Sequence, residues 1–77
     1  MTRLRLVSYA RLAKVAEAKG FRWIRTSGSH NIFRNESGKI VVIPDHGAQV
    51  IVRPLLRKIL RDLGMSPEEY EGLLREV

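Results

Sequence analysis

Apolar side chains recur at helical spacing in two stretches of the chain. In the first stretch, one face is formed by Tyr9, Leu12, Ala13 and Ala16. These residues occupy the i, i+3, i+4 and i+7 positions of an amphipathic helix. Ser8 precedes them as an expected N-cap, and Gly20 follows them as an expected stop. The pattern therefore predicts a helix over residues 8–19, with residues 1–7 as a loose lead-in.

The second stretch begins at Pro54 and ends before Gly64. Its apolar face is formed by Leu55, Leu56, Ile59, Leu60 and Leu63. Proline suits the first turn of a helix and glycine suits the position after its last turn, so this stretch predicts a helix over residues 54–63. Ser66 and Glu69 form a capping box, which predicts a further short helix near the end of the chain.

Between the helices the pattern changes to that of strands. Residues 21–26, 30–35 and 40–43 are rich in aromatic and β-branched side chains, which favour strands. A turn at residues 27–29 and a hairpin loop at residues 36–39 separate them, and each contains a glycine. The third run is the most apolar, so we expect it to be the central strand, ended by the proline that follows it. The element order is then α-β-β-β-α with a short C-terminal helix, an α+β fold.

The strand over residues 30–35 has two alternating faces. If Phe33 faces the core, His30, Ile32 and Arg34 share the opposite face. The reverse assignment would bury His30, and it would also bury Arg34 without a partner, which is costly. We therefore favour the assignment that leaves His30 exposed.

The length and charge of the chain favour a large anionic partner. A chain of 77 residues makes one domain, over residues 1–77, with a thin core and shallow sites. Residues 1–61 hold thirteen lysines and arginines against three acids, a balance of +10. Residues 62–77 hold one arginine against five acids, a balance of −4. The basic part fits a polyanion such as nucleic acid, and a merely well-solvated surface is the alternative.

The lack of cysteine and the small number of histidines exclude several kinds of covalent and metal chemistry. The chain has no cysteine, which excludes disulfides and a cysteine nucleophile. With only two histidines, we expect no metal site and no cofactor. No apolar run approaches the roughly 20 residues that a bilayer requires, so we expect a cytoplasmic protein without a membrane partner.

The turn Gly28-Ser29-His30 is the main candidate for chemistry. Histidine titrates near neutral pH, and the neighbouring glycine lets another backbone approach closely. His30 is therefore a candidate for cutting a phosphodiester. A hydrogen bond from His30 to a neighbouring backbone group is the alternative. We interpret Ser29 as a turn residue rather than a nucleophile, because no Ser-His-Asp arrangement surrounds it.

A set of motifs stands in a fixed order over roughly residues 8–64. It consists of a helix ending in Gly20-Phe21, Arg25 five residues before His30, the Gly28-Ser29-His30 turn, Phe33, the apolar run into Pro44-Asp45-His46, and a helix with Leu55, Ile59, Leu60, Leu63 and Gly64. Together these motifs resemble the HicA family, the small ribonuclease toxins of HicA–HicB toxin–antitoxin systems.

The resemblance implies a fold like the double-stranded-RNA-binding domain, a three-stranded antiparallel sheet with both helices on one face. It also implies an endoribonuclease that degrades mRNA until a HicB-like antitoxin covers it. The family's catalytic histidine maps onto His30. The chain departs from the family in two places: Arg53-Pro54 stands where members often carry a glycine, and the acidic extension over residues 65–77 lies beyond the matching core.

RNA is cut without metal when its own 2′-hydroxyl attacks the adjacent phosphate. His30 can supply the base or the acid for this reaction. The other expected RNA contacts are the cations Arg25, Arg34 and Lys39 near His30, the backbone N–H groups of Gly28 and Ser29, and His46. For His46 a plain loop role is the alternative.

Two further sets of side chains each have two interpretations. Trp23 packs in the core or stacks on a base. The row Arg53, Arg57 and Arg61 follows RNA phosphates or only solvates its helix.

Two rival functions belong to other classes. The first is a non-catalytic RNA-binding module of the same fold, which reads the shape of the RNA and does not need His30. The second is an interaction subunit that docks a protein through its acidic tail or its basic face.

Overall fold

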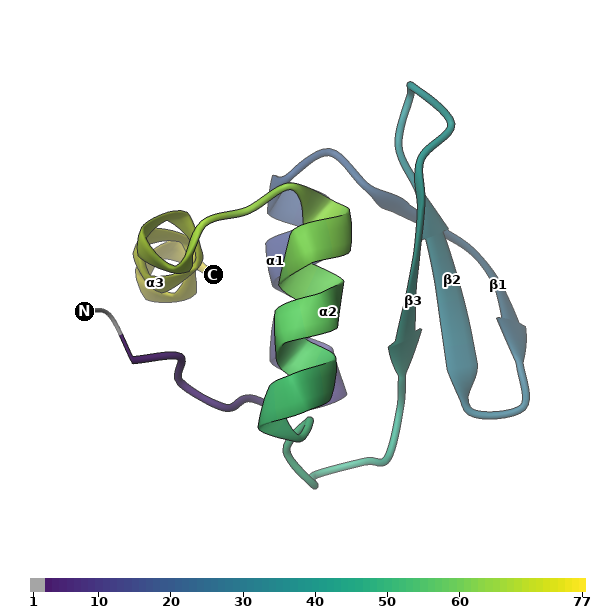
Figure 1. Cartoon of the computed structure of the whole chain (residues 1–77). Coiled ribbons are helices and arrows are strands. Elements are labelled where there is room, and N and C mark those ends of the chain that lie inside the picture. Colours follow the sequence, from purple (N-terminus) through teal and green to yellow (C-terminus); the bar gives the residue numbers. More distant parts are fainter. Residues whose placement is uncertain (1–2) are drawn as a thin grey trace.

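The computed structural model describes residues 3–77, which form three layers (Figure 1). In chain order the elements are α1 (Tyr9–Ala18), β1 (Arg22–Ser27), β2 (His30–Arg34), β3 (Ile40–Pro44), α2 (Arg53–Leu63) and α3 (Pro67–Glu76). The sheet forms one outer layer, α1 and α2 lie together against one of its faces, and α3 lies on the far side of these helices. The predicted α+β class and the order α-β-β-β-α with an added helix are confirmed.

The helices begin and end close to the predicted residues because local signals fix their ends. Ser8 stands at the N-cap of α1, although its side chain makes no capping hydrogen bond. α2 has proline in its first turn and ends at Gly64, which is in the left-handed conformation. In α3 the predicted cap forms: Ser66 Oγ accepts a hydrogen bond from the backbone N–H of Glu69.

The three strands form an antiparallel sheet in the order β1-β2-β3. The central strand is β2, so the prediction that residues 40–43 form the central strand is wrong. Two consecutive hairpins place the middle strand of the sequence in the middle of the sheet. β3 is apolar for another reason: Val41 and Ile43 are buried beneath the helices, while Ile40 and Val42 remain 52% and 39% exposed at the edge.

Strand register separates the two faces of the sheet. Phe33 pairs with Val41 and Asn31 pairs with Ile43, and all four side chains are buried on the helix side. His30 and Arg34 therefore point to the other side and are exposed. This confirms the assignment favoured from the sequence.

The lead-in before α1 is packed rather than loose. Leu4 and Val7 belong to the hydrophobic core. The Leu4 carbonyl accepts a hydrogen bond from the Arg53 guanidinium at 2.7 Å, and the backbone N–H of Ile51 donates to the Val7 carbonyl at 2.9 Å. The expectation of a loose segment is therefore wrong for residues 3–7; residues 1 and 2 lie outside the described part.

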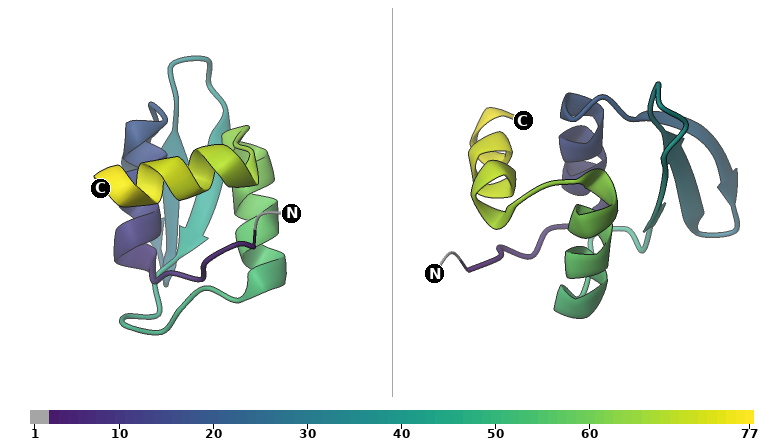
Figure 2. Two further views of the ribbon diagram at one scale, coloured as in Figure 1. Left: turned by 90° about the vertical axis from the view of Figure 1, so that its left-hand side faces the viewer. Right: turned by 45° about the horizontal axis from the view of Figure 1, so that its top comes forward.

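The C-terminal helix completes the core from outside. Tyr70 and Leu74 of α3 are 0% and 3% exposed, and the Tyr70 hydroxyl donates to the Arg5 carbonyl. Figure 2 shows α3 and the N-terminal segment on the side of α1 and α2 that faces away from the sheet. This layer leaves the opposite face of the sheet uncovered.

Candidate active site

The turn that carries the candidate histidine is a tight hairpin. Ser27 pairs with His30, so only Gly28 and Ser29 link β1 to β2. Gly28 has φ +61°, and no described residue other than glycine has positive φ. A positive φ at the first loop position only is the pattern of a type II′ hairpin turn, which requires glycine there. A Cβ atom added at position 28 would meet no atom within 4 Å other than those of its chain neighbours, so the outer side of the turn is open.

The loop after β3 is attached to the same end of the sheet. Pro44 pairs with His30, and the Asp45 backbone N–H donates to the Ser29 carbonyl at 2.7 Å. The Asp45 Oδ1 atom accepts a hydrogen bond from the Gly47 backbone N–H at 2.9 Å. This bracing holds the loop containing His46 beside the turn that precedes His30.

The phenol of Tyr9 interacts electrostatically with Asp45, in the loop after β3. Burial and the Asp45 carboxylate raise the pKa of Tyr9 above its ordinary value, and Glu17 adds to the effect. The Tyr9 ring lies 6.5 Å from the ring of Phe33, measured between centroids. Tyr9 therefore stays protonated and neutral on the helix side of the sheet.

The imidazole of His30 is exposed and makes no hydrogen bond or ion pair with any other residue in the range 3–77. The alternative, a hydrogen bond from His30 to a neighbouring backbone group, is therefore absent among the described residues. An imidazole without a protein partner keeps both ring nitrogens available to a ligand.

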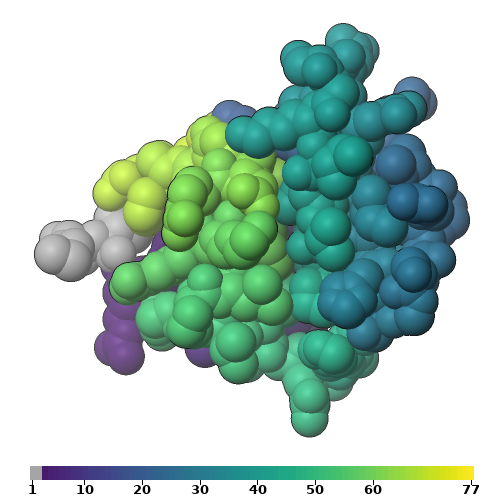
Figure 3. Space-filling model, turned by 45° about the vertical axis from the view of Figure 1, so that its right-hand side comes forward, coloured from purple at the N-terminus to yellow at the C-terminus, as the bar shows by residue number. Residues whose placement is uncertain are grey.

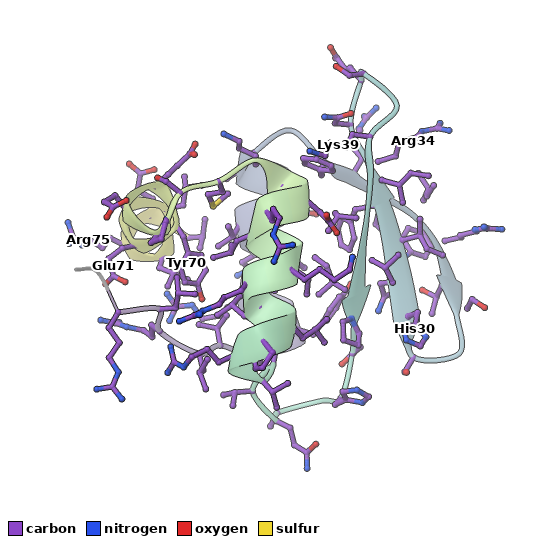
Figure 4. The ribbon with its side chains drawn as sticks, in the orientation of Figure 1. His30, Arg34, Lys39, Tyr70, Glu71 and Arg75 are labelled. Atoms are coloured by element: carbon purple, nitrogen blue, oxygen red, sulfur yellow. The ribbon has the colours of Figure 1, made fainter. Side chains whose placement is uncertain are left out.

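The predicted cations divide between the two ends of the sheet. Arg25 pairs with Ile32, which places it on the same face as His30 and two residues further along β2. Arg34 lies four residues from His30, about 13 Å along the strand, and Lys39 lies beyond it. Figure 4 shows Arg34 and Lys39 at the end of the sheet opposite His30. The expectation that all three cations lie near His30 is therefore corrected: only Arg25 does.

The face of the sheet opposite the helices is the open face, and it carries mostly cationic and aliphatic side chains. Register places on it Arg22, Arg25, His30, Ile32, Arg34, Ile40 and Val42. Figure 3 shows the strands forming an exposed surface beside α2. None of the ion pairs among residues 3–77 involves these arginines.

Trp23 is exposed rather than packed in the core. Its pairing with Phe33 places it on the helix side of β1, yet it is 53% exposed, so the packing interpretation is wrong. Arg22 and Asp45 were not among the predicted site residues. Arg22 pairs with Arg34 across the two strands, and the backbone N–H of Asp45 donates to the Ser29 carbonyl. Both partners are distant in the sequence, so no local sequence signal predicts them.

Residues 3–77 contain no cluster of three or more histidines, aspartates and glutamates placed to hold a metal ion. None of their helices combines the length and apolar character needed to cross a membrane.

Fold and site define an α+β domain whose uncovered sheet face presents one histidine and several arginines that form no ion pair within residues 3–77. Residues 9–65 match the family described as HicA toxin of bacterial toxin–antitoxin. The chain belongs to the HicA toxin family, and it is the toxin of a toxin–antitoxin pair. No curated protein sequence matches it.

Proposed function

We propose that this toxin is an endoribonuclease that cleaves mRNA in the cytoplasm, with His30 as its general acid or base. The observation that supports this best is the position of His30: it is exposed at a corner of the sheet, its imidazole has no hydrogen-bond or ion-pair partner among residues 3–77, and the turn beside it is open on its outer side. Such a corner admits a polymer backbone.

The reaction uses the substrate's own nucleophile. A base removes the proton of the ribose 2′-hydroxyl, and the 2′-oxygen attacks the adjacent phosphorus. The bond to the 5′-oxygen breaks, and that oxygen takes a proton from an acid. The products are a 2′,3′-cyclic phosphate and a 5′-hydroxyl. His30 serves as the base, the acid or both, and one such group contributes about 10²–10⁴-fold to the rate.

Charge that develops on the phosphate needs donors close to His30. Arg25 is the nearest predicted cation on the open face, and the Gly28 and Ser29 backbone N–H groups lie in the turn itself. His46 follows at the same end of the sheet and is a candidate for the second proton transfer. Arg34 and Lys39 are too far along the sheet for the cleaved phosphate, so we assign them to more distant parts of the RNA chain.

The test uses a long single-stranded RNA in excess chelator, with an all-deoxy strand of the same sequence beside it. We expect cleavage of the RNA only, in fractions that co-elute with the toxin. Intact RNA together with a salt-dependent gel shift would contradict cleavage and support the non-catalytic RNA-binding module. Cleavage of both strands would contradict attack by the 2′-hydroxyl.

A further inference from the structure

Two adjoining hollows lie along α2, on the far side of the molecule from the open face. One, of about 400 Å³, is lined by the N-terminal segment, the start of α2 and one residue of α3. The other, of about 380 Å³, is lined by α2 alone, and Arg53 belongs to both linings, so the two form one continuous surface. Among the described residues, five arginines line it, and we call it the arginine surface: Arg3, Arg5, Arg53, Arg57 and Arg61.

The arginines of α2 stand four residues apart, so they form a row along one side of the helix. Like charges at this spacing repel each other and destabilise a helix. Neither Arg57 nor Arg61 forms an ion pair within residues 3–77, although the neighbouring Lys58 pairs with Asp62 at 2.9 Å. A partner with several negative charges along its length would relieve the repulsion in this row.

The N-terminal segment holds two more arginines beside the row. The Arg53 guanidinium donates to the Leu4 carbonyl at 2.7 Å, which fixes the segment against the start of α2. The one acid among the described lining residues is Glu71 of α3, labelled in Figure 4, and it lies 3.4 Å from the Arg5 guanidinium. The lining therefore carries five positive charges against one negative.

The composition of this surface favours a nucleic acid over a protein partner. From Arg53 to Arg61 the row spans about 12 Å, and guanidinium groups suit phosphates as hydrogen-bond partners. The core of a protein–protein interface is instead poor in charge and rich in aromatic side chains. None of the large exposed hydrophobic side chains of the described residues lines either hollow.

We propose that the arginine surface binds backbone phosphates of the RNA substrate at a place remote from the cleaved bond. That the polyanion is RNA rests on the function proposed above. The molecule measures 34 × 28 × 21 Å, so an RNA of mRNA length can pass around it and contact both this surface and His30. The surface then increases the affinity for long RNA and takes no part in the chemistry.

The test measures the salt dependence of RNA binding by fluorescence anisotropy. The probe is a long single strand of 2′-O-methyl RNA, which has no 2′-hydroxyl to attack, so the unmodified toxin can be used. Arg57→Gln and Arg61→Gln should each reduce the slope of log affinity against log salt by about 0.7, and should weaken binding equally for strands of different sequence.

Lys58→Gln is the matched control on the same helix. It removes the same charge, but Lys58 is paired with Asp62 and lines neither hollow, so the slope should stay unchanged. An equal loss of slope in Lys58→Gln and Arg57→Gln would overturn the proposal, because only net charge would then matter. So would a toxin that does not bind the probe even at low salt.

Glu71→Gln should act in the opposite direction. It removes the acid from the lining and frees Arg5, so the affinity for the probe should rise. A folding defect would not strengthen binding, which makes this variant independent of the losses expected above. Unchanged or weaker binding by Glu71→Gln would contradict the proposal.

The remaining outcomes separate this proposal from the ribonuclease proposal. The expected slopes without any cleavage of unmodified RNA by the toxin would contradict the ribonuclease and still support the arginine surface. Cleavage by the toxin with unchanged slopes in Arg57→Gln and Arg61→Gln would overturn the arginine surface only. Weaker antitoxin binding by these variants with unchanged RNA slopes would also overturn it, because the surface would then be a protein contact.

Discussion

At the scale of single residues, the turn before β2 contains a position that suits glycine alone. Gly28 has φ +61° with open space around it, so an added side chain would strain the backbone without clashing. Gly72 in α3 also has open space, but its φ is not positive. These two glycines therefore separate backbone strain from the effect of added volume.

We expect Gly28→Ala to lower the free energy of unfolding by about 1–2 kcal/mol, because an alanine in the left-handed region is strained. Gly72→Ala should raise it by up to about 1 kcal/mol, because alanine favours the helix. Urea unfolding of both variants measures the difference. Equal effects of the two substitutions would mean that the conformation of the turn does not constrain position 28.

Residue-level signals also explain which parts of the molecule the sequence predicted. Caps, prolines and glycines act within a few residues, so the helix ends and the Gly28 turn were predictable. The exposure of Trp23 and the burial of Leu4 were not, because they depend on which elements lie above them. The same holds for the opposition of Arg22 and Arg34, which exists only once the register of β1 and β2 is set.

At the scale of elements, α3 is tied to the lead-in through one buried phenol. Burial raises the pKa of Tyr70 to about 12 from its ordinary value of 10.0, and the neighbouring Glu71 carboxylate adds to the effect. The Tyr70 hydroxyl donates a hydrogen bond to the Arg5 carbonyl, and only the neutral, protonated form of the phenol can make this bond. Ion pairs such as Arg5–Glu71, at 3.4 Å on the surface, add little.

This pKa predicts how stability depends on pH. A group whose pKa is raised on folding stabilises the protein fully below its unfolded pKa, and this stabilisation is lost as pH rises through the folded value. The contribution of Tyr70 should therefore be complete below pH 10 and lost as the pH rises from there to about 12. Tyr70→Phe should flatten the fall in unfolding free energy over this range, and should cost about 1 kcal/mol at neutral pH through the lost hydrogen bond. Urea titrations at several pH values test this; an unchanged alkaline slope in the variant would contradict it.

Strand order shows the limit of reasoning from single elements. The apolar run at residues 40–43 suggested a central strand, yet β3 has a strand on one side only. β3 is apolar because one of its faces is buried under α1 and α2. A central strand buried in the same way would have the same apolar composition. Only the pairing pattern of the whole sheet distinguishes the two.

At the scale of the whole molecule, the two faces differ in what they offer a partner. On one side, α3 and the N-terminal segment cover α1 and α2 (Figure 2). On the other side, the open face of the sheet exposes His30 and arginines that form no ion pair within the described residues. A shallow site of this kind is blocked when a segment of the antitoxin lies across it. We therefore expect the antitoxin to cover the end of the open face that carries His30.

Chemical modification measures this coverage. Diethyl pyrocarbonate should modify His30 readily in the toxin alone, because its imidazole is exposed, and the antitoxin complex should protect it. Peptide mass spectrometry reports His30 and His46 separately. An antitoxin that inhibits the toxin while His30 remains as reactive as before would show that inhibition acts elsewhere.

The most direct test of the proposed function is the single-turnover cleavage rate of His30→Ala on one RNA, with His46→Ala beside it and RNA affinity measured for both. If His30 transfers a proton in the reaction, His30→Ala should lose about 10²–10⁴-fold in rate while its affinity for RNA is preserved. A His30→Ala variant that cleaves at the rate of the unmodified toxin would show that His30 takes no part in the chemistry.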